Sequence, residues 1–310
     1  MKEIVTLTLN PAFDMHCTVD RFAPYHENLA RIDTYEAGGK GVNISRALSV
    51  NGVENLCFAV LGEENGEGFL KRLAADGIPC RTLTVPGRIR ENITIHTEHA
   101  DETRISFSGF TADESLLARV SEALDEEIGE GTMVTFTGRV PEGMSMSSVK
   151  AFLRELQKKG ARIVIDSRSF SLADLLEMRP FLIKPNQEEI SAYLGREIES
   201  FSEVLDAARE LYGKGIENVM ISLGAKGALL VSSEGAYVAE PPVIEARSTI
   251  GAGDSSIGGF LAATKEGFSA PERLCRSVAY GSAACMTEGT RPPKREDVAS
   301  LLPQITVTAL

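Results

Sequence analysis

The feature that most constrains the fold is the alternation of short apolar runs with longer helical patterns along most of the chain. Runs rich in valine, isoleucine, leucine and phenylalanine, without polar alternation, are typical of strands buried on both faces of a sheet. Such strands alternating with helices predict an α/β fold with a parallel sheet flanked by helices. The predicted strands cover residues 4–9, 56–61, 133–137, 162–166, 181–184 and 219–223.

Segments with helical periodicity separate these strands. The C-terminal part, from residue 254 to about residue 287, is expected to be almost wholly helical. The other predicted helices cover residues 42–51, 66–76, 115–128, 145–159, 188–194 and 204–214.

Two regions follow a two-residue alternation instead, which is typical of antiparallel strands with one solvated face. Residues 16–20 are expected to pair with 30–36, and residues 92–99 with 103–107 around a turn at 100–102. So few strands are too small to stand alone. We therefore expect one domain, residues 1–310, with a β-sheet lid inserted at about 12–37 and 88–110 that closes over a substrate, joins two subunits, or both.

Composition excludes several classes of protein. A net charge of −12 disfavours nucleic acid and anionic membranes as partners, because both need a basic surface. No apolar run approaches the roughly 20 residues of a membrane span, and the N-terminus resembles a strand rather than a signal peptide. Five scattered cysteines without a CxxC pair predict reduced thiols. A soluble cytoplasmic protein is expected, in which local cations must attract any anionic substrate.

The strongest motif is Gly251-Ala252-Gly253-Asp254, directly before a helical pattern. Glycines at a helix start expose backbone N–H groups to one point, which favours a phosphate. An aspartate there can accept the proton of a hydroxyl that attacks this phosphate. The alternative is that Asp254 only caps the helix. The chain lacks a GxxxxGK[ST] motif, and the third glycine of the dinucleotide fingerprint is absent.

A second glycine cluster, Gly38-Gly39-Lys40-Gly41, also precedes a helical pattern. Lys40 adds a positive charge to the exposed amides, which suits a phosphate or a phosphorylated polyol. The alternative is a tight turn with a solvated lysine. Two anion sites in one chain are what a kinase acting on a phosphorylated substrate needs.

Polar residues follow two of the buried strands, where open α/β sheets bind ligands. Asp14 lies just past the first strand and can accept hydrogen bonds from sugar hydroxyls, or it belongs to an Asx-type turn. Lys184, Asn186 and Glu189 follow the strand at 181–184. Asn186 and Glu189 can form a helix capping box, and Glu189 can also hold Mg²⁺ through water.

Weaker signals come from a small-residue turn and from the lid. Ser222, Gly224 and Gly227 suit close backbone approach to a nucleotide, or merely a hairpin turn. Arg90 with Asn92 and, separately, Arg31 lie on lid strands that would close over the substrate, although exposed strand arginines are usually only solvated charges.

Five motifs together resemble the PfkB (ribokinase-like) carbohydrate kinase family, in the order the family has them and across nearly the whole chain. Within the family the phosphosugar branch is most similar, and residues 28–31 and 107–110 resemble 1-phosphofructokinase most. The five motifs lie at residues 10–14, 38–43, 184–189, 222–227 and 251–254.

The resemblance implies a doubly wound, mostly parallel sheet with a β-sheet lid that pairs subunits into a homodimer, and ATP and Mg²⁺ as cofactors. It implies ATP-dependent phosphorylation of D-fructose 1-phosphate to D-fructose 1,6-bisphosphate, with tagatose 6-phosphate or fructose 6-phosphate as alternative substrates and a non-catalytic sugar-phosphate sensor as the remaining alternative. The implied roles are Asp254 as base with the Gly251, Ala252 and Gly253 amides on the transferred phosphoryl group; Asp14, Gly39, Asn43 and Asn92 on the sugar; Lys40, Arg90 and Arg31 on its existing phosphate; and Lys184, Asn186, Glu189, Ser222, Gly224 and Gly227 on the nucleotide and metal side.

Two positions depart from the family pattern. Arg139 stands where this branch usually has serine, so a long cation lies beside the expected substrate pocket and either contacts the sugar phosphate or alters substrate choice. Ser256 replaces a bulky apolar residue after the catalytic motif, and we expect it to affect helix packing more than chemistry.

Overall fold

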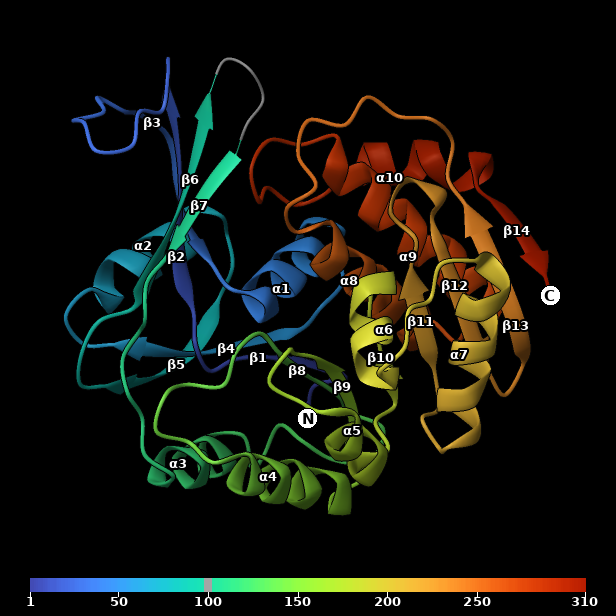
Figure 1. Cartoon of the computed structure of the whole chain (residues 1–310). Coiled ribbons are helices and arrows are strands. Elements are labelled where there is room, and N and C mark those ends of the chain that lie inside the picture. Colours follow the sequence, from blue (N-terminus) through green and yellow to red (C-terminus); the bar gives the residue numbers. More distant parts are fainter. Residues whose placement is uncertain (98–101) are drawn as a thin grey trace.

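A large, mostly parallel sheet runs through the molecule (Figure 1). The computed structural model describes residues 1–97 and 102–310. Within them the strand order is β14-β13-β12-β11-β10-β9-β8-β1-β4-β5, parallel from β5 to β11 and antiparallel from β11 to β14. The strands are β1 (Ile4–Thr8), β4 (Leu56–Gly62), β5 (Cys80–Val85), β8 (Met133–Thr137), β9 (Arg162–Asp166), β10 (Leu182–Ile183), β11 (Val219–Ser222), β12 (Ala228–Ser232), β13 (Gly235–Glu240) and β14 (Thr306–Ala309).

The six strands predicted from apolar runs are confirmed as β1, β4, β8, β9, β10 and β11. They form the parallel centre of the sheet, where both faces are covered, and this burial explains their unbroken apolar character. The prediction missed β5 at one edge and the antiparallel strands β12, β13 and β14 at the other. The outermost strands β5 and β14 are partly exposed, so they lack the unbroken apolar run on which the prediction relied.

Helices cover both faces of the sheet, as a doubly wound fold requires (Figure 1). One face carries α1 (Lys40–Val50), α2 (Gly66–Ala75), α8 (Ala252–Lys265) and α9 (Ala270–Cys285), with α10 (Arg295–Leu301) packed on α9. The other face carries α3 (Ser115–Ala123), α4 (Met146–Lys158), α5 (Leu172–Met178), α6 (Gln187–Leu194) and α7 (Phe201–Gly213). No described helix is both long and apolar enough to span a membrane.

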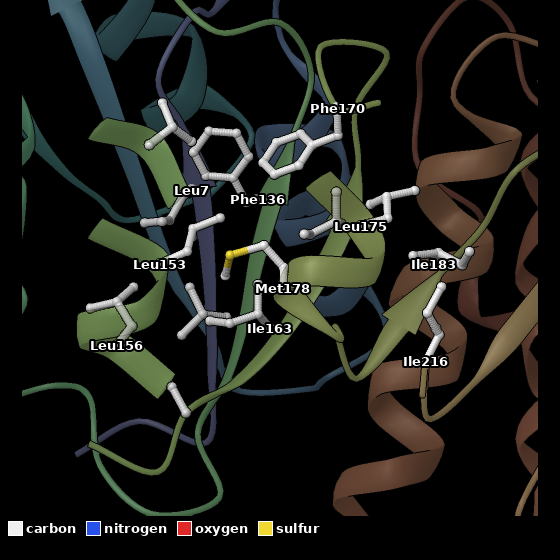
Figure 2. Packing of buried hydrophobic residues seen from close by; sticks show 14 of the residues in the cluster. Leu7, Phe136, Leu153, Leu156, Ile163, Phe170, Leu175, Met178, Ile183 and Ile216 are labelled. Carbon is white, nitrogen blue, oxygen red and sulfur yellow. The ribbon is translucent and has the colours of Figure 1, made fainter. Parts of the chain in front are cut away.

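Side chains from adjacent strands interlock with helices in the larger core cluster. Figure 2 shows Leu7, Phe136 and Ile163, from β1, β8 and β9, facing Leu153 and Leu156 of α4. All five side chains are nearly inaccessible to solvent. Burying each such side chain stabilises the fold by roughly 1.5–3 kcal/mol, so this packing holds the strand ends in fixed positions.

A separate small sheet is present where the lid strands were predicted, and we keep the name lid for it. Its strand order is β3-β2-β6-β7, with antiparallel pairs β2–β3 and β6–β7 joined by the parallel pair β2–β6. Figure 1 shows this sheet projecting from the main sheet near α1 and α2. The predicted turn at residues 100–102 falls mostly outside the described residues, which resume at Glu102. The strands are β2 (Ala12–Val19), β3 (Arg31–Gly38), β6 (Arg90–Thr97) and β7 (Glu102–Ser106).

Candidate active site

The N-terminus of α8 offers free backbone donors. Gly251 is the N-cap residue and adopts a left-handed conformation (φ 79°), which glycine tolerates without strain. The N–H groups of Gly253 and Asp254 have no acceptor within the described part of the chain. Helix N-termini carry partial positive charge, so these groups can bind an anion. A side chain at position 253 would lie only 2.9 Å from Nζ of Lys184, which brings a full positive charge to the same point.

Asp254 is not the helix cap, so the alternative that it only caps the helix is wrong. The cap position belongs to Gly251, and Oδ2 of Asp254 instead accepts a hydrogen bond from Nδ2 of Asn43 at 2.9 Å. Burial raises the pKa of Asp254 to about 6; Lys40 opposes this rise and Asp166 adds to it. A carboxylate with this pKa is ionised at neutral pH yet basic enough to accept a proton.

Two lysines and a second carboxylate surround Asp254. Nζ of Lys40 lies 2.7 Å from Oδ2 of Asp166, and Lys184 is buried nearby. Burial alone would raise the pKa of Asp166, but Lys184 and Lys40 outweigh this and lower it. Burial likewise opposes the rise in the pKa of Lys40 that Asp166 and Asp254 cause. Sequence reasoning missed Asp166, although its position at the end of β9 was a signal of the kind used for Asp14.

Six residues were predicted on the nucleotide and metal side, and all of them except Glu189 line one cavity. It has a volume of about 540 Å³ and extends to Ala252 and Gly253 at the start of α8. Apolar residues of the segment 241–246 and small residues of α9 form its remaining walls, and the sequence pointed to neither. Ser256 also lines this cavity, so its departure from the family pattern affects the cavity as well as the packing. The five residues are Lys184, Asn186, Ser222, Gly224 and Gly227.

Glu189 lies beside Asp166 in a smaller adjoining pocket. The predicted capping box is confirmed, because Asn186 and Glu189 exchange hydrogen bonds of 2.7 Å and 3.1 Å, and Arg168 pairs with the second oxygen of Glu189 at 2.9 Å. Among the described residues no three histidine, cysteine, aspartate or glutamate side chains gather to hold a metal. Two carboxylates suit Mg²⁺ only if phosphate and water oxygens complete its shell.

Residues of two paired lid strands, β2 and β6, meet near the start of α1. Asp14 was expected just past the first strand but lies within β2. Asn92 donates to Asp14 at 2.8 Å, and Arg90 donates to Asn92 at 3.1 Å. A side chain at Gly38 would overlap the Asp14 carboxylate, which explains the glycine there. Gly39 is the N-cap of α1, and its φ of 120° is one that glycine adopts readily and other residues rarely adopt.

Among the described residues the Arg90 guanidinium donates only to Asn92, and its buried Nε lacks an acceptor. Burial lowers the pKa of Arg90; Asp14 opposes this and the charge of Arg139 adds to it. The charges of Arg90 and Arg139 therefore act on each other. Lys40 is held elsewhere, on Asp166 and near Asp254.

Arg31 is not brought together with these residues. Its side chain is 78% exposed and pairs with Asp33 at the outer end of β3. Gly38, at the other end of β3, is seven residues away, which is about 23 Å along a strand. One side chain cannot span that distance within a single chain.

Comparisons with known proteins place the chain in a family. A family model described as pfkB family carbohydrate kinase matches residues 8–297. The chain is 33% identical to 1-phosphofructokinase of Escherichia coli K12 over 261 residues, covering 84% of this chain and 83% of the relative. It is 32% identical to ATP-dependent 6-phosphofructokinase isozyme 2 of the same strain over 300 residues, covering 96% and 97%. The crystal structure of phosphofructokinase-2 from Escherichia coli in complex with substrates and products superposes with a TM-score of 0.92 at 30% identity, covering 97% and 99%.

Proposed function

The chain belongs to the pfkB family of carbohydrate kinases and is a sugar-phosphate kinase, and we propose that it transfers a phosphoryl group from ATP to the 6-hydroxyl of D-fructose 1-phosphate. The products are ADP and D-fructose 1,6-bisphosphate. The observation that carries the proposal is the buried Asp254 carboxylate, which follows the cavity-lining Ala252 and Gly253 and accepts a hydrogen bond from Asn43 in the first turn of α1.

Asp254 acts as the general base in this proposal. The 6-hydroxyl oxygen attacks the γ-phosphorus while its proton passes to the Asp254 carboxylate, and the bond from phosphorus to the bridging oxygen of ADP breaks. The free amides of Gly253 and Asp254 and the two lysines near Asp254 stabilise the charge on the transferred group, whereas the Ala252 amide, also expected there, donates to the Thr249 carbonyl. Little covalent work falls to the protein, so positioning supplies most of the acceleration.

The sugar binds between the lid and the start of α1. Asp14, Gly39, Asn43 and Asn92 hold its hydroxyls. Arg90 with Arg139 holds its existing phosphate, since the buried Nε of Arg90 lacks an acceptor and the charge of Arg139 acts on it. Lys40 was expected to join them. Its ion pair with Asp166 instead favours a contact with the phosphoryl group in transit.

ATP occupies the cavity lined by Lys184, Asn186, Ser222, Gly224 and Gly227. Glu189 would hold Mg²⁺ through water, with Asp166 as a second carboxylate. When bound, Mg²⁺ would offset negative charge on the phosphates. The residues of this chain orient the nucleotide so that its γ-phosphate lies at the start of α8.

Identity alone does not choose among phosphosugars, since the two relatives are 33% and 32% identical to this chain. The choice of fructose 1-phosphate rests on the motifs at residues 28–31 and 107–110. An ADP-release assay with fructose 1-phosphate, tagatose 6-phosphate, fructose 6-phosphate and unphosphorylated fructose tests it. The highest kcat/KM with fructose 1-phosphate is expected. A higher value with another phosphosugar would reassign the substrate, and saturable binding without ADP release would indicate a sensor.

We also propose that two subunits pair through the lid. Exposed large apolar side chains gather there, and burying them against a second copy would remove them from water. Arg31 lies too far from the site of its own chain, so in such a dimer it would contact the site of the partner subunit. The exposed apolar residues of the lid segments are Tyr25, Leu29, Ile32, Ile105 and Phe107.

A further inference from the structure

Arg46 is a buried arginine whose guanidinium makes four hydrogen bonds within the chain. It lies on α1 and is only 3% exposed. Its Nη2 donates to the carbonyl of Ala37 at 2.7 Å and to Asp76 at 2.8 Å, Nε donates to Asp76 at 3.1 Å, and Nη1 donates to Oδ1 of Asn43 at 3.3 Å. A buried guanidinium is costly to desolvate and gives little net stability even when paired, so the contact that it makes with Asn43 is of more interest than its contribution to stability.

The contact with Asn43 determines which way that amide faces. Asn43 and Arg46 are three residues apart on α1, so their side chains are neighbours on one helix face. Because Oδ1 of Asn43 accepts from Arg46, its Nδ2 must face Asp254, to which it donates at 2.9 Å. A flipped amide would turn N–H groups toward the guanidinium and an oxygen toward the carboxylate, and both contacts would be repulsive.

Arg46 also joins three elements around the site. Asp76 is the C-cap residue of α2, and Ala37 lies at the end of β3, next to the glycines at the start of α1. One side chain therefore ties the base of the lid, α1 and α2 to the hydrogen bond that reaches Asp254.

We propose that Arg46 is a positioning residue for phosphoryl transfer, which holds the Asn43 amide so that it donates to Asp254 and aims the carboxylate at the substrate hydroxyl. The inference rests on the proposed role of Asp254 as base. Nothing in the sequence motifs pointed to Arg46, because its contacts join segments that are far apart along the chain.

The expected consequence is a change in the acidity of Asp254. The donated hydrogen bond from Asn43 lowers the pKa of Asp254 against the larger effect of burial. The charged groups that also act on it are Lys40 and Lys184, which lower it, and Asp166, which raises it. Without Arg46 the amide is free to turn, so the pKa of Asp254 should rise and the acid limb of the activity profile should move to higher pH.

The test compares R46M and R46K with R72M as a matched control. Arg72 ties α2 to β3 through the Tyr35 carbonyl at 2.9 Å, and it has no hydrogen bond to Asn43 or Asp254. ADP release from ATP and fructose 1-phosphate is measured across the pH range, together with Tm. R46M should lower kcat about 10- to 100-fold, with smaller changes in KM, and move the acid limb upward. R46K should recover Tm but not the acid limb, because an ammonium cannot reproduce the fork. R72M should lower Tm and leave the limb in place.

A second readout does not depend on activity. Carboxyl ¹³C NMR of aspartate-labelled protein, with the Asp254 signal assigned by its loss in D254N, follows the protonation of this group directly. A pKa of Asp254 higher in R46M or R46K than in wild type supports the proposal. If R46M does not fold, R46K and D76N carry the same measurement. An unchanged Asp254 titration and acid limb in the folded variants would overturn it and leave Arg46 a structural residue. Full activity in D254N would instead overturn the proposed base, while the NMR result on Arg46 would still stand.

Discussion

Asn43 donates a hydrogen bond of 2.9 Å to Asp254, and this contact joins residues 211 positions apart in the chain. It brings the starts of α1 and α8 together, and with them both glycine-rich motifs. Each helix start carries partial positive charge, which attracts a phosphate to the region where the Asp254 carboxylate lies. The predictions below follow from that arrangement.

Replacing Asp254 by asparagine should remove the base and keep the fold. The amide has the shape of the carboxylate and can still accept from Asn43, but it cannot take the proton of the hydroxyl. We expect kcat to fall by about 10² to 10⁴ while the Kd for ATP stays near that of wild type. Steady-state kinetics and calorimetric ATP binding measure the two. Activity within a few-fold of wild type would remove Asp254 from this role.

Activity should fall on the acid side as Asp254 becomes protonated. Burial raises the pKa of Asp254 to about 6, and the base must be ionised to act. The kcat/KM profile of the free enzyme should therefore decline as the pH drops through about 6 and be level above it. A limb near the ordinary aspartate pKa of about 4 would contradict the buried, proton-accepting carboxylate.

The same raised pKa of Asp254, which serves catalysis, should lower the stability of the folded protein at neutral pH. A folded-state pKa raised above the unfolded value stabilises the protein below the unfolded pKa, and this stabilisation is lost as the pH rises through about 6. D254N avoids that loss. Its unfolding free energy should exceed that of wild type by on the order of 1–3 kcal/mol at pH 8 and by much less at pH 4.5. Denaturant titrations at both pH values check this, and an equal difference at both would show that ionisation of Asp254 is not the cause.

Arg139 should matter for the phosphate of the substrate. It is exposed, and its charge acts on Arg90. R139S should raise KM for phosphosugars about 5- to 30-fold, as expected for the loss of a charge-assisted contact, without changing KM for ATP. R119S, on α3, serves as the matched surface control. An unchanged KM for every phosphosugar would show that Arg139 is only a charge at the rim.

Charges on the lid should disrupt the proposed dimer. Ile32 and Ile105 are 58% and 41% exposed on lid strands, whereas Leu70 is 37% exposed on α2. I32K and I105K should shift wild-type dimer to monomer in light scattering, and L70K should not. A monomeric wild type, or a dimer that all three variants leave intact, would contradict pairing through the lid.

Local patterns were enough for the centre of the fold and for part of the site. The strands β8 and β9 match their predicted bounds because burial on both faces leaves an unbroken apolar run. The α8 start was predictable because Gly251 adopts a conformation that other residues avoid. The residues of the nucleotide cavity also came from motifs next to strand ends.

The missed residues act through contacts that no local pattern contains. In the sequence Asp166 is only the end of a buried strand, and its role depends on Lys40, which the fold brings to 2.7 Å from it. Arg46 is likewise an ordinary helix residue in the sequence, and its role depends on its contacts with Asp76, Ala37 and Asn43. Arg31 is the opposite case, since its motif position suggested a site residue and its place on β3 puts it far away.

The amino-acid sequence by itself determined the parallel α/β centre, the lid hairpins and the two glycine-rich helix starts, because periodicity and glycine conformation are local properties. Only the tertiary structure decided that Asp254 is buried against Asn43, that Lys40 pairs with Asp166, and that Arg90 donates to Asn92. Burial and charge interactions depend on distances through space, and those distances exist only once the chain has folded.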